Sequence, residues 1–103
     1  MSCTRMGINV GMADDAIRRR VTVRGRVQGV AFRDSLRRRA DSRHVAGWAS
    51  NRPDGAVEAV FEGRPEDVEQ LVEYAKTGPR HAEVDSVDVR EEPPEGLTRF
   101  DIR

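Results

Sequence analysis

Alternating apolar and polar residues predict five β-strands along the chain. Val21, Val23 and Val27 alternate with polar positions, which is the period of a half-buried strand, and a loop containing two glycines at residues 25–29 ends that segment. Pro53-Asp54-Gly55 provides the turn chemistry of a tight hairpin, so the strands on either side of it should pair antiparallel. The later strands are predicted at residues 45–50, 56–62, 84–89 and 100–102.

Apolar residues at helical spacing predict two helices. Phe32, Leu36 and Ala40 recur every four residues and share one face of a helix over about residues 31–43. A second helix begins near Pro65, because proline suits the first helical turn, and it stops before Gly78-Pro79. Its buried stripe is formed by Val68, Leu71, Val72 and Ala75. Of the large aromatics, Phe32 and Trp48 are predicted to lie in the core.

The order of these elements predicts an α+β fold of the ferredoxin-like type. Strand, helix, two strands, helix and strand close most simply as an antiparallel sheet with both helices on one face, here followed by a short C-terminal strand. A length of 103 residues suits one domain, which we place at residues 19–103. Residues 1–18 have no usable apolar face and are predicted to form a disordered leader, with Met12 as an alternative first residue.

Charge is balanced overall but divided unevenly between the two halves of the chain. The 18 basic and 18 acidic residues give a formal net charge of zero, which offers no general attraction for nucleic acid. Residues 1–52 contain 12 arginines and 4 acidic residues, whereas residues 53–103 contain 6 basic and 14 acidic residues. An anionic ligand is therefore expected to bind the first half.

The cysteine and histidine content indicates the cellular compartment and whether a metal site is expected. Cys3 is the single cysteine, so no intramolecular disulfide can form and a reducing compartment is expected. No apolar run approaches a signal peptide or the ~20 residues of a membrane span. His44 and His81 are isolated, so no metal site is expected. We expect a cytoplasmic monomer with no cofactor, membrane partner or nucleic-acid partner.

Residues 25–33 connect the first strand to the first helix and have the features of an anion site. Backbone N–H groups at a helix N-terminus have no intrahelical partner and carry partial positive charge. Gly25 and Gly29 allow the loop to curl so that successive N–H groups converge. Arg33 follows in the first helical turn, where its planar guanidinium can bind two oxygens of one anion.

Two segments of the chain resemble the acylphosphatase family. Gly25-Arg26-Val27-Gln28-Gly29-Val30, followed two residues later by Phe32-Arg33, matches the family's first signature. Gly47-Trp48-Ala49-Ser50-Asn51 resembles its Gly-Trp-Val-x-Asn segment, and Asp54-Gly55 with Val57-Glu58 matches its hairpin. The likeness covers about residues 20–103 and departs at Ala31, where many relatives carry an aromatic residue, and at Ala49, where valine is common.

The resemblance implies an enzyme that hydrolyses the carboxyl-phosphate bond of a small acyl phosphate by direct attack of water. It implies that Arg33 is the catalytic arginine that binds the phosphate and that Asn51 orients the water. It also implies a phosphate-binding loop made of Arg26, Val27, Gln28, Gly29 and Val30. This chemistry needs mainly positioning and charge stabilisation, since the leaving carboxylate is a good one.

Two other functions remain open at this point. A noncatalytic ferredoxin-like module that binds a small anion, or one that docks onto a larger maturation enzyme, would keep the same loop. Such a module has no obvious need for Asn51. RNA binding is disfavoured, because the chain has only five aromatic residues and no RNP1 pattern.

Overall fold

Within the part of the chain that the structure describes, five strands and two helices follow one another in the order that the sequence pattern predicts. The computed structural model describes residues 16–103. Ile17 and Arg18 belong to the first strand rather than to the predicted leader, whereas the rest of that leader, with Met12, lies outside the described residues apart from Ala16. The elements are β1 (Ile17–Arg26), α2 (Phe32–Ser42), β2 (Ala46–Asn51), β3 (Val57–Gly63), α3 (Pro65–Ala75), β4 (Glu83–Glu92) and β5 (Phe100–Ile102).

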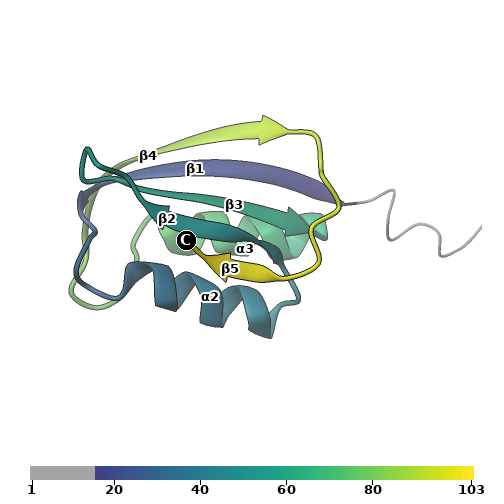
Figure 1. Ribbon diagram of the computed structural model, residues 1–103, viewed down its shortest axis with the longest axis horizontal. Helices are drawn as coiled ribbons and strands as arrows, with labels where there is room; N and C mark the ends of the chain where they lie inside the picture. The colour runs from purple at the N-terminus through teal and green to yellow at the C-terminus, as the bar shows by residue number, and fades with distance from the viewer. Residues whose placement is uncertain (1–15) are drawn as a thin grey trace, which may run out of the picture.

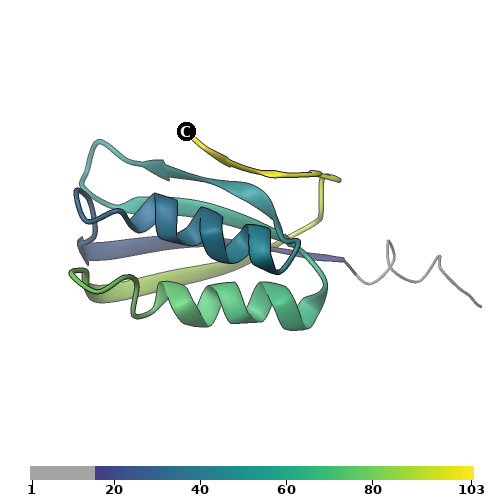
Figure 2. The same ribbon diagram turned by 90° about the horizontal axis from the view of Figure 1, so that it is seen from below.

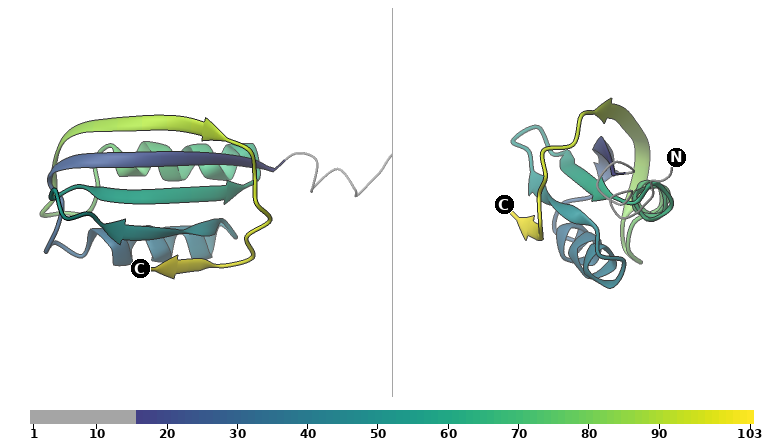
Figure 3. Two further views of the ribbon diagram at one scale, coloured as in Figure 1. Left: turned by 45° about the horizontal axis from the view of Figure 1, so that its top comes forward. Right: turned by 90° about the vertical axis from the view of Figure 1, so that its right-hand side faces the viewer.

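The strands form one sheet in the order β4-β1-β3-β2-β5 (Figure 1; Figure 3, left). The first four strands pair antiparallel, which confirms the ferredoxin-like fold. β5 instead runs parallel to β2, with Phe100 opposite Gly47, so the complete sheet is mixed. Both helices lie on one face of the sheet (Figure 2; Figure 3, right), as predicted. Neither helix of the described part is long and apolar enough to cross a membrane.

The core fills the space between the helices and the covered face of the sheet. Val21 and Val23 of β1 and Phe61 of β3 are fully buried there, and they pack against Leu36 of α2 and Leu71 of α3. Each fully buried side chain of this size stabilises the fold by roughly 1.5–3 kcal/mol. The apolar periodicity of the sequence therefore identified the layer that carries most of the packing energy.

A β-bulge at Gly25 corrects the predicted end of the first strand. Gly25 is part of β1 rather than of the loop, and the register with β4 shifts between Arg24 and Gly25. Its φ is +129°, and a Cβ atom would come within 2.2 Å of the Glu83 carbonyl oxygen, so only glycine fits. Val27 lies beyond the strand but is buried, which explains why it appeared to continue the alternation.

Trp48 does not lie in the core, contrary to the sequence-based prediction. It is half-buried in β2 and is absent from the core cluster, unlike the buried Phe32. The guanidinium groups of Arg20 and Arg103 lie 5.3 Å and 4.6 Å from its ring centroid. This cation–π packing covers the indole with charged side chains and leaves the aromatic ring outside the apolar layer.

A buried carboxylate, that of Glu62, holds the connector between β4 and β5. Glu62 is only 4% exposed and accepts hydrogen bonds from the backbone N–H groups of Glu95, Gly96 and Leu97 at 2.9–3.1 Å. It also pairs with Arg18, which is itself 3% exposed and bonds Glu92. Burial opposes ionisation of Glu62, but these donors outweigh it and lower its pKa. The connector is thereby fixed to the centre of the sheet.

The Arg18 and Arg20 network should make stability depend on pH in the acid range. Hydrogen bonds from Arg20 and then Arg18 lower the pKa of Glu92 from 4.5 to about 2. A carboxylate with a depressed pKa stabilises the fold above its unfolded pKa and loses that effect as pH falls towards the folded value. We expect the midpoint of thermal unfolding to fall between pH 4.5 and 2, and to fall less steeply in Glu92→Gln.

Thermal unfolding followed by circular dichroism across that pH range checks this expectation. Glu69→Gln, at an exposed position of α3, is the matched control and should keep the steep dependence of the parent. Equal slopes in Glu92→Gln and in the parent would show that Glu92 is not the titrating group.

Candidate active site

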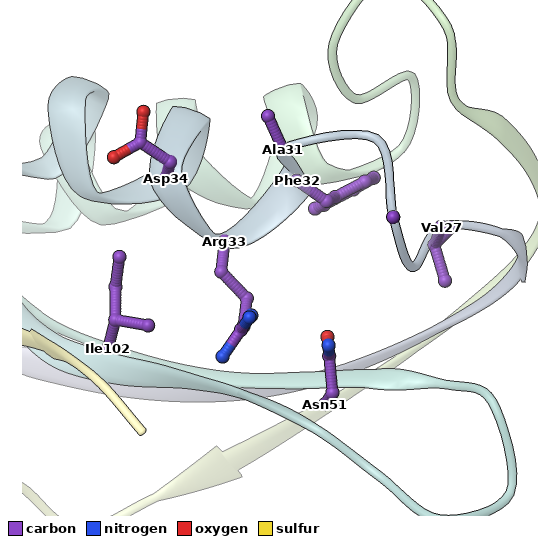
Figure 4. A pocket seen from close by; sticks show the side chains of 8 residues that line it. Val27, Ala31, Phe32, Arg33, Asp34, Asn51 and Ile102 are labelled. Atoms are coloured by element: carbon purple, nitrogen blue, oxygen red, sulfur yellow. The ribbon is translucent and has the colours of Figure 1, made fainter.

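A small cavity lies where the β1–α2 loop meets the ends of β2 and β5. Its volume is about 160 Å³, and it opens between α2 and the sheet (Figure 4). The walls come from three parts of the chain that are distant in sequence, namely residues 27–34, Asn51 and Ile102. The lining residues are Val27, Gly29, Ala31, Phe32, Arg33, Asp34, Asn51 and Ile102.

Helix α2 presents an uncapped N-terminus to this cavity. Its N-cap residue is Ala31, whose side chain cannot accept a hydrogen bond, and no side-chain cap is formed. The first helical bond runs from the Ser35 N–H to the Ala31 carbonyl oxygen at 3.0 Å. The N–H groups of residues 32–34 precede that bond, so they are available to an anion placed at the positive end of the helix dipole.

The loop before α2 has the backbone conformation of an anion cradle. Gly29 has φ +78° and Ala31 has φ +61°, both in the left-handed region. Such residues turn successive N–H groups towards the same side of the chain. A left-handed conformation costs a non-glycine residue about 1–2 kcal/mol, so Ala31 stores strain at the edge of the cavity.

Arg33 and Asn51 enter the cavity from opposite layers of the fold. In Figure 4 the Arg33 side chain descends from α2 towards the sheet, and the Asn51 side chain rises from the end of β2. The guanidinium Nη1 of Arg33 donates to the Arg103 carbonyl oxygen at 2.8 Å, which steadies it from the side of β5. Guanidinium carries five N–H donors, so the others remain for an oxyanion. The structure therefore brings together two predicted residues that are 18 positions apart.

The cavity also contains one carboxylate, which is already paired. Asp34 Oδ1 accepts from Arg37 Nη2 at 3.1 Å, and its Oδ2 lies 3.2 Å from Arg38 Nη1. These exposed pairs contribute little to stability, but they offset the negative charge beside Arg33. The balance of charge around the cavity remains favourable to an anion.

Gln28 has a role that the sequence did not assign. Its side chain does not line the cavity, and its Nε2 donates to the carbonyl oxygens of Arg52 and Ala56 at 2.9 Å and 3.0 Å. Those carbonyl groups belong to the hairpin turn that directly follows Asn51. Gln28 thus ties the loop to the hairpin and sets the spacing between the loop and Asn51.

The predicted site residues divide into two groups. Arg33, Asn51, Val27 and Gly29 line the cavity, whereas Gln28, Arg26 and Val30 do not. Arg26 is the exposed last residue of β1, and Val30 packs against the core.

Sequence reasoning missed the contributions of Ile102 and Arg103. Their positions follow from the pairing of β5 with β2, which joins residues about 50 positions apart. Ile102 carried one usable signal, since it is an apolar residue in a short strand. That signal does not distinguish a core position from a cavity wall.

Comparisons with known proteins find similar chains over most of the described residues. The family model described as acylphosphatase matches residues 19–102. The chain is 55% identical over 85 residues to an acylphosphatase of Rubrobacter xylanophilus, covering 82% of this chain and 77% of the relative. It is 49% identical over 87 residues to one of Gloeobacter violaceus, covering 84% and 94%. An acylphosphatase structure from Coxiella burnetii superposes with a TM-score of 0.85 at 35% identity, covering 89% and 97%.

Replacing Ala31 by glycine should stabilise the protein. Glycine adopts the left-handed conformation freely, and this outweighs the greater freedom that it gives the unfolded chain, for a net gain of about 0.5–1 kcal/mol. Urea denaturation of Ala31→Gly measures the change. Ala40→Gly, in the buried interior of the same helix, is the control and should lose about 1 kcal/mol or more. A loss in both variants would argue against strain at Ala31.

Replacing Gln28 by leucine should destabilise the protein by about 1–3 kcal/mol. Leucine is similar in size but cannot donate the two hydrogen bonds that Gln28 makes, so the carbonyl oxygens of Arg52 and Ala56 keep only their backbone donors. Urea denaturation measures the loss. Gln70→Leu, at an exposed position of α3, is the control and should stay within about 0.5 kcal/mol of the parent. Equal effects of the two substitutions would contradict a tie between loop and hairpin.

Proposed function

The chain belongs to the acylphosphatase family, and on that premise we propose how its cavity hydrolyses the carboxyl-phosphate bond of an acyl phosphate. The observation that carries the proposal is that Arg33 and Asn51, from different layers of the fold, line one cavity beside an uncapped helix N-terminus. An anion site and a side chain able to hold water are thus adjacent. Hydrolysis of an acyl phosphate needs both.

The phosphoryl group would be bound by the loop and by Arg33. Its oxygens would accept hydrogen bonds from the backbone N–H groups of residues 26–30 and from the start of α2. The Arg33 guanidinium would bind two of the oxygens and neutralise the charge that develops as the phosphoryl group transfers. The bond between Arg33 and the Arg103 carbonyl oxygen supports this orientation in the free enzyme.

Asn51 would hold the attacking water by its side-chain amide. The water oxygen attacks phosphorus in line with the leaving carboxylate, and the bond between phosphorus and the carboxyl oxygen breaks. The proton released by the water passes to a phosphoryl oxygen, which yields a carboxylate and inorganic phosphate. No covalent nucleophile is needed, and the described side chains that line the cavity include no Cys, His or Ser.

We also propose that the enzyme is monomeric and cytoplasmic. Arg33, Asn51 and the N-terminus of α2, which are the groups that the proposed reaction uses, all belong to one chain, as a monomeric enzyme requires. The exposed edge strand β4 carries Glu83, Asp85, Asp88 and Glu91, which disfavour pairing with the same edge of another copy. The single cysteine supports a reducing compartment.

The alternative function, a noncatalytic anion-binding module, predicts that the protein does not hydrolyse acyl phosphates. It accounts for the loop and Arg33 but not for Asn51 in the same cavity.

RNA binding is disfavoured further by the open face of the sheet, where Arg18 and Arg20 are paired with glutamates and the Trp48 ring packs against two guanidinium groups.

Substitution of Arg33 and Asn51 tests the proposed roles. We expect Arg33→Ala and Asn51→Ala each to lower kcat for benzoyl phosphate by about 10²–10³-fold, as for other preorganised donors. Arg33→Ala should also weaken competitive inhibition by inorganic phosphate, whereas Asn51→Ala should leave it within about threefold, because Asn51 acts on the water. Initial rates at equal folded concentration give both values.

Arg43→Ala is the matched control, because Arg43 follows the C-terminal end of α2 and pairs with Asp67 away from the cavity. It should keep the parent activity. A folded parent without turnover would favour the anion-binding module. Loss of phosphate inhibition in Asn51→Ala would assign Asn51 to phosphate binding instead of water.

A further inference from the structure

Ile102 is an exposed apolar side chain at a polar site. Among the described residues, it and Val89 are the large hydrophobic side chains that remain most exposed, at 37% and 41%. Val89 lies in the edge strand β4, far along the sheet from the cavity, whereas Ile102 lines the cavity with Arg33 and Asn51. An exposed isoleucine beside a phosphate site has no evident packing purpose.

The backbone that carries Ile102 is firmly held. Phe100 is buried and stacks on Phe61, with ring centroids 6.0 Å apart. The Gly47 N–H donates to the Arg99 carbonyl oxygen at 3.0 Å, and the Arg103 N–H donates to the Ala49 carbonyl oxygen at 2.8 Å. Glu62 fixes the connector that leads into β5. Ile102 therefore has a defined position and does not belong to a loosely attached end.

Ile102 and Asn51 lie on opposite sides of the Arg33 side chain in Figure 4. In an in-line displacement, the leaving group departs on the side of phosphorus opposite the attacking water. A water held by Asn51 thus places the acyl group on the side of the cavity away from Asn51, where Ile102 forms a wall.

The acyl group of a bound substrate would lie in the cavity outside the loop of residues 26–30. The N–H donors and Arg33 suit the phosphoryl half of the substrate, and the apolar half must extend past them. Among the side chains that line the cavity, Ile102 is the large apolar one that is not already buried in the core.

We propose that Ile102 contacts the acyl group and makes the enzyme prefer acyl phosphates with bulky apolar acyl groups, such as aryl ones, over acetyl phosphate. This inference rests on the proposed function of the same cavity. Ile102 determines specificity and takes no part in the chemical step. Covering its exposed surface with an apolar group releases water and favours the larger substrate.

The test compares kcat/KM for benzoyl phosphate and for acetyl phosphate in the parent, Ile102→Thr and Val89→Thr. Threonine keeps the β-branched shape that suits a strand and removes apolar surface. We expect Ile102→Thr to lower the preference for benzoyl phosphate by about three- to tenfold. Its kcat/KM for acetyl phosphate and its inhibition constant for inorganic phosphate should stay within about twofold. Val89→Thr should keep the parent's preference.

The outcomes separate this inference from the proposed function. A parent that hydrolyses both substrates, with an unchanged preference in Ile102→Thr, would overturn the role of Ile102 and leave the proposed function standing. A parallel loss on both substrates with weaker phosphate inhibition would also overturn it, since Ile102 would then act by holding Arg33. A folded parent inactive on both substrates would overturn the proposed function and this inference together.

Discussion

The buried ion pair between Arg18 and Glu62 is the interaction on which the arrangement of the site depends. Glu62 lies in the central strand β3 and binds three backbone N–H groups of the connector that leads to β5. Buried charges are costly unless they are fully hydrogen-bonded, and here Arg18 and those N–H groups satisfy the carboxylate. Because β5 is only three residues long, its place beside β2 depends on this anchor as much as on its own ladder.

The cavity, in contrast, contains local features that destabilise the free protein. The N-terminus of α2 has no side-chain cap, and Ala31 adopts a conformation that glycine would adopt more easily. Both features cost stability in the free protein. Both also leave N–H donors directed at the place where we propose that the phosphoryl group binds. The core layer that Leu36 and Leu71 share with the sheet supports this local strain.

Much of the fold was accessible from the sequence because its elements are short and strongly patterned. Helix α3 begins at Pro65 and ends before Gly78, as predicted, and the hairpin at Pro53-Asp54-Gly55 pairs β2 with β3. The errors occurred where one residue breaks a regular period. The bulge at Gly25 moved a glycine into the strand, and Val27 continued the alternation beyond it. Trp48 was assigned to the core because its neighbours are apolar, although it faces outward.

The joint roles of Arg33 and Asn51 were implied by the resemblance of their two segments to the family's motifs, whereas the sequence by itself determined the layered α+β fold and the loop before α2. These are local properties, set by periodicity, turn chemistry and residue type within a few positions. Only the tertiary structure decided that Gln28 reaches the hairpin, that Glu62 clamps the β4–β5 connector and that Ile102 forms a wall of the cavity. Those contacts join residues at least 24 positions apart, and no local pattern encodes which distant strand edge a short segment will meet.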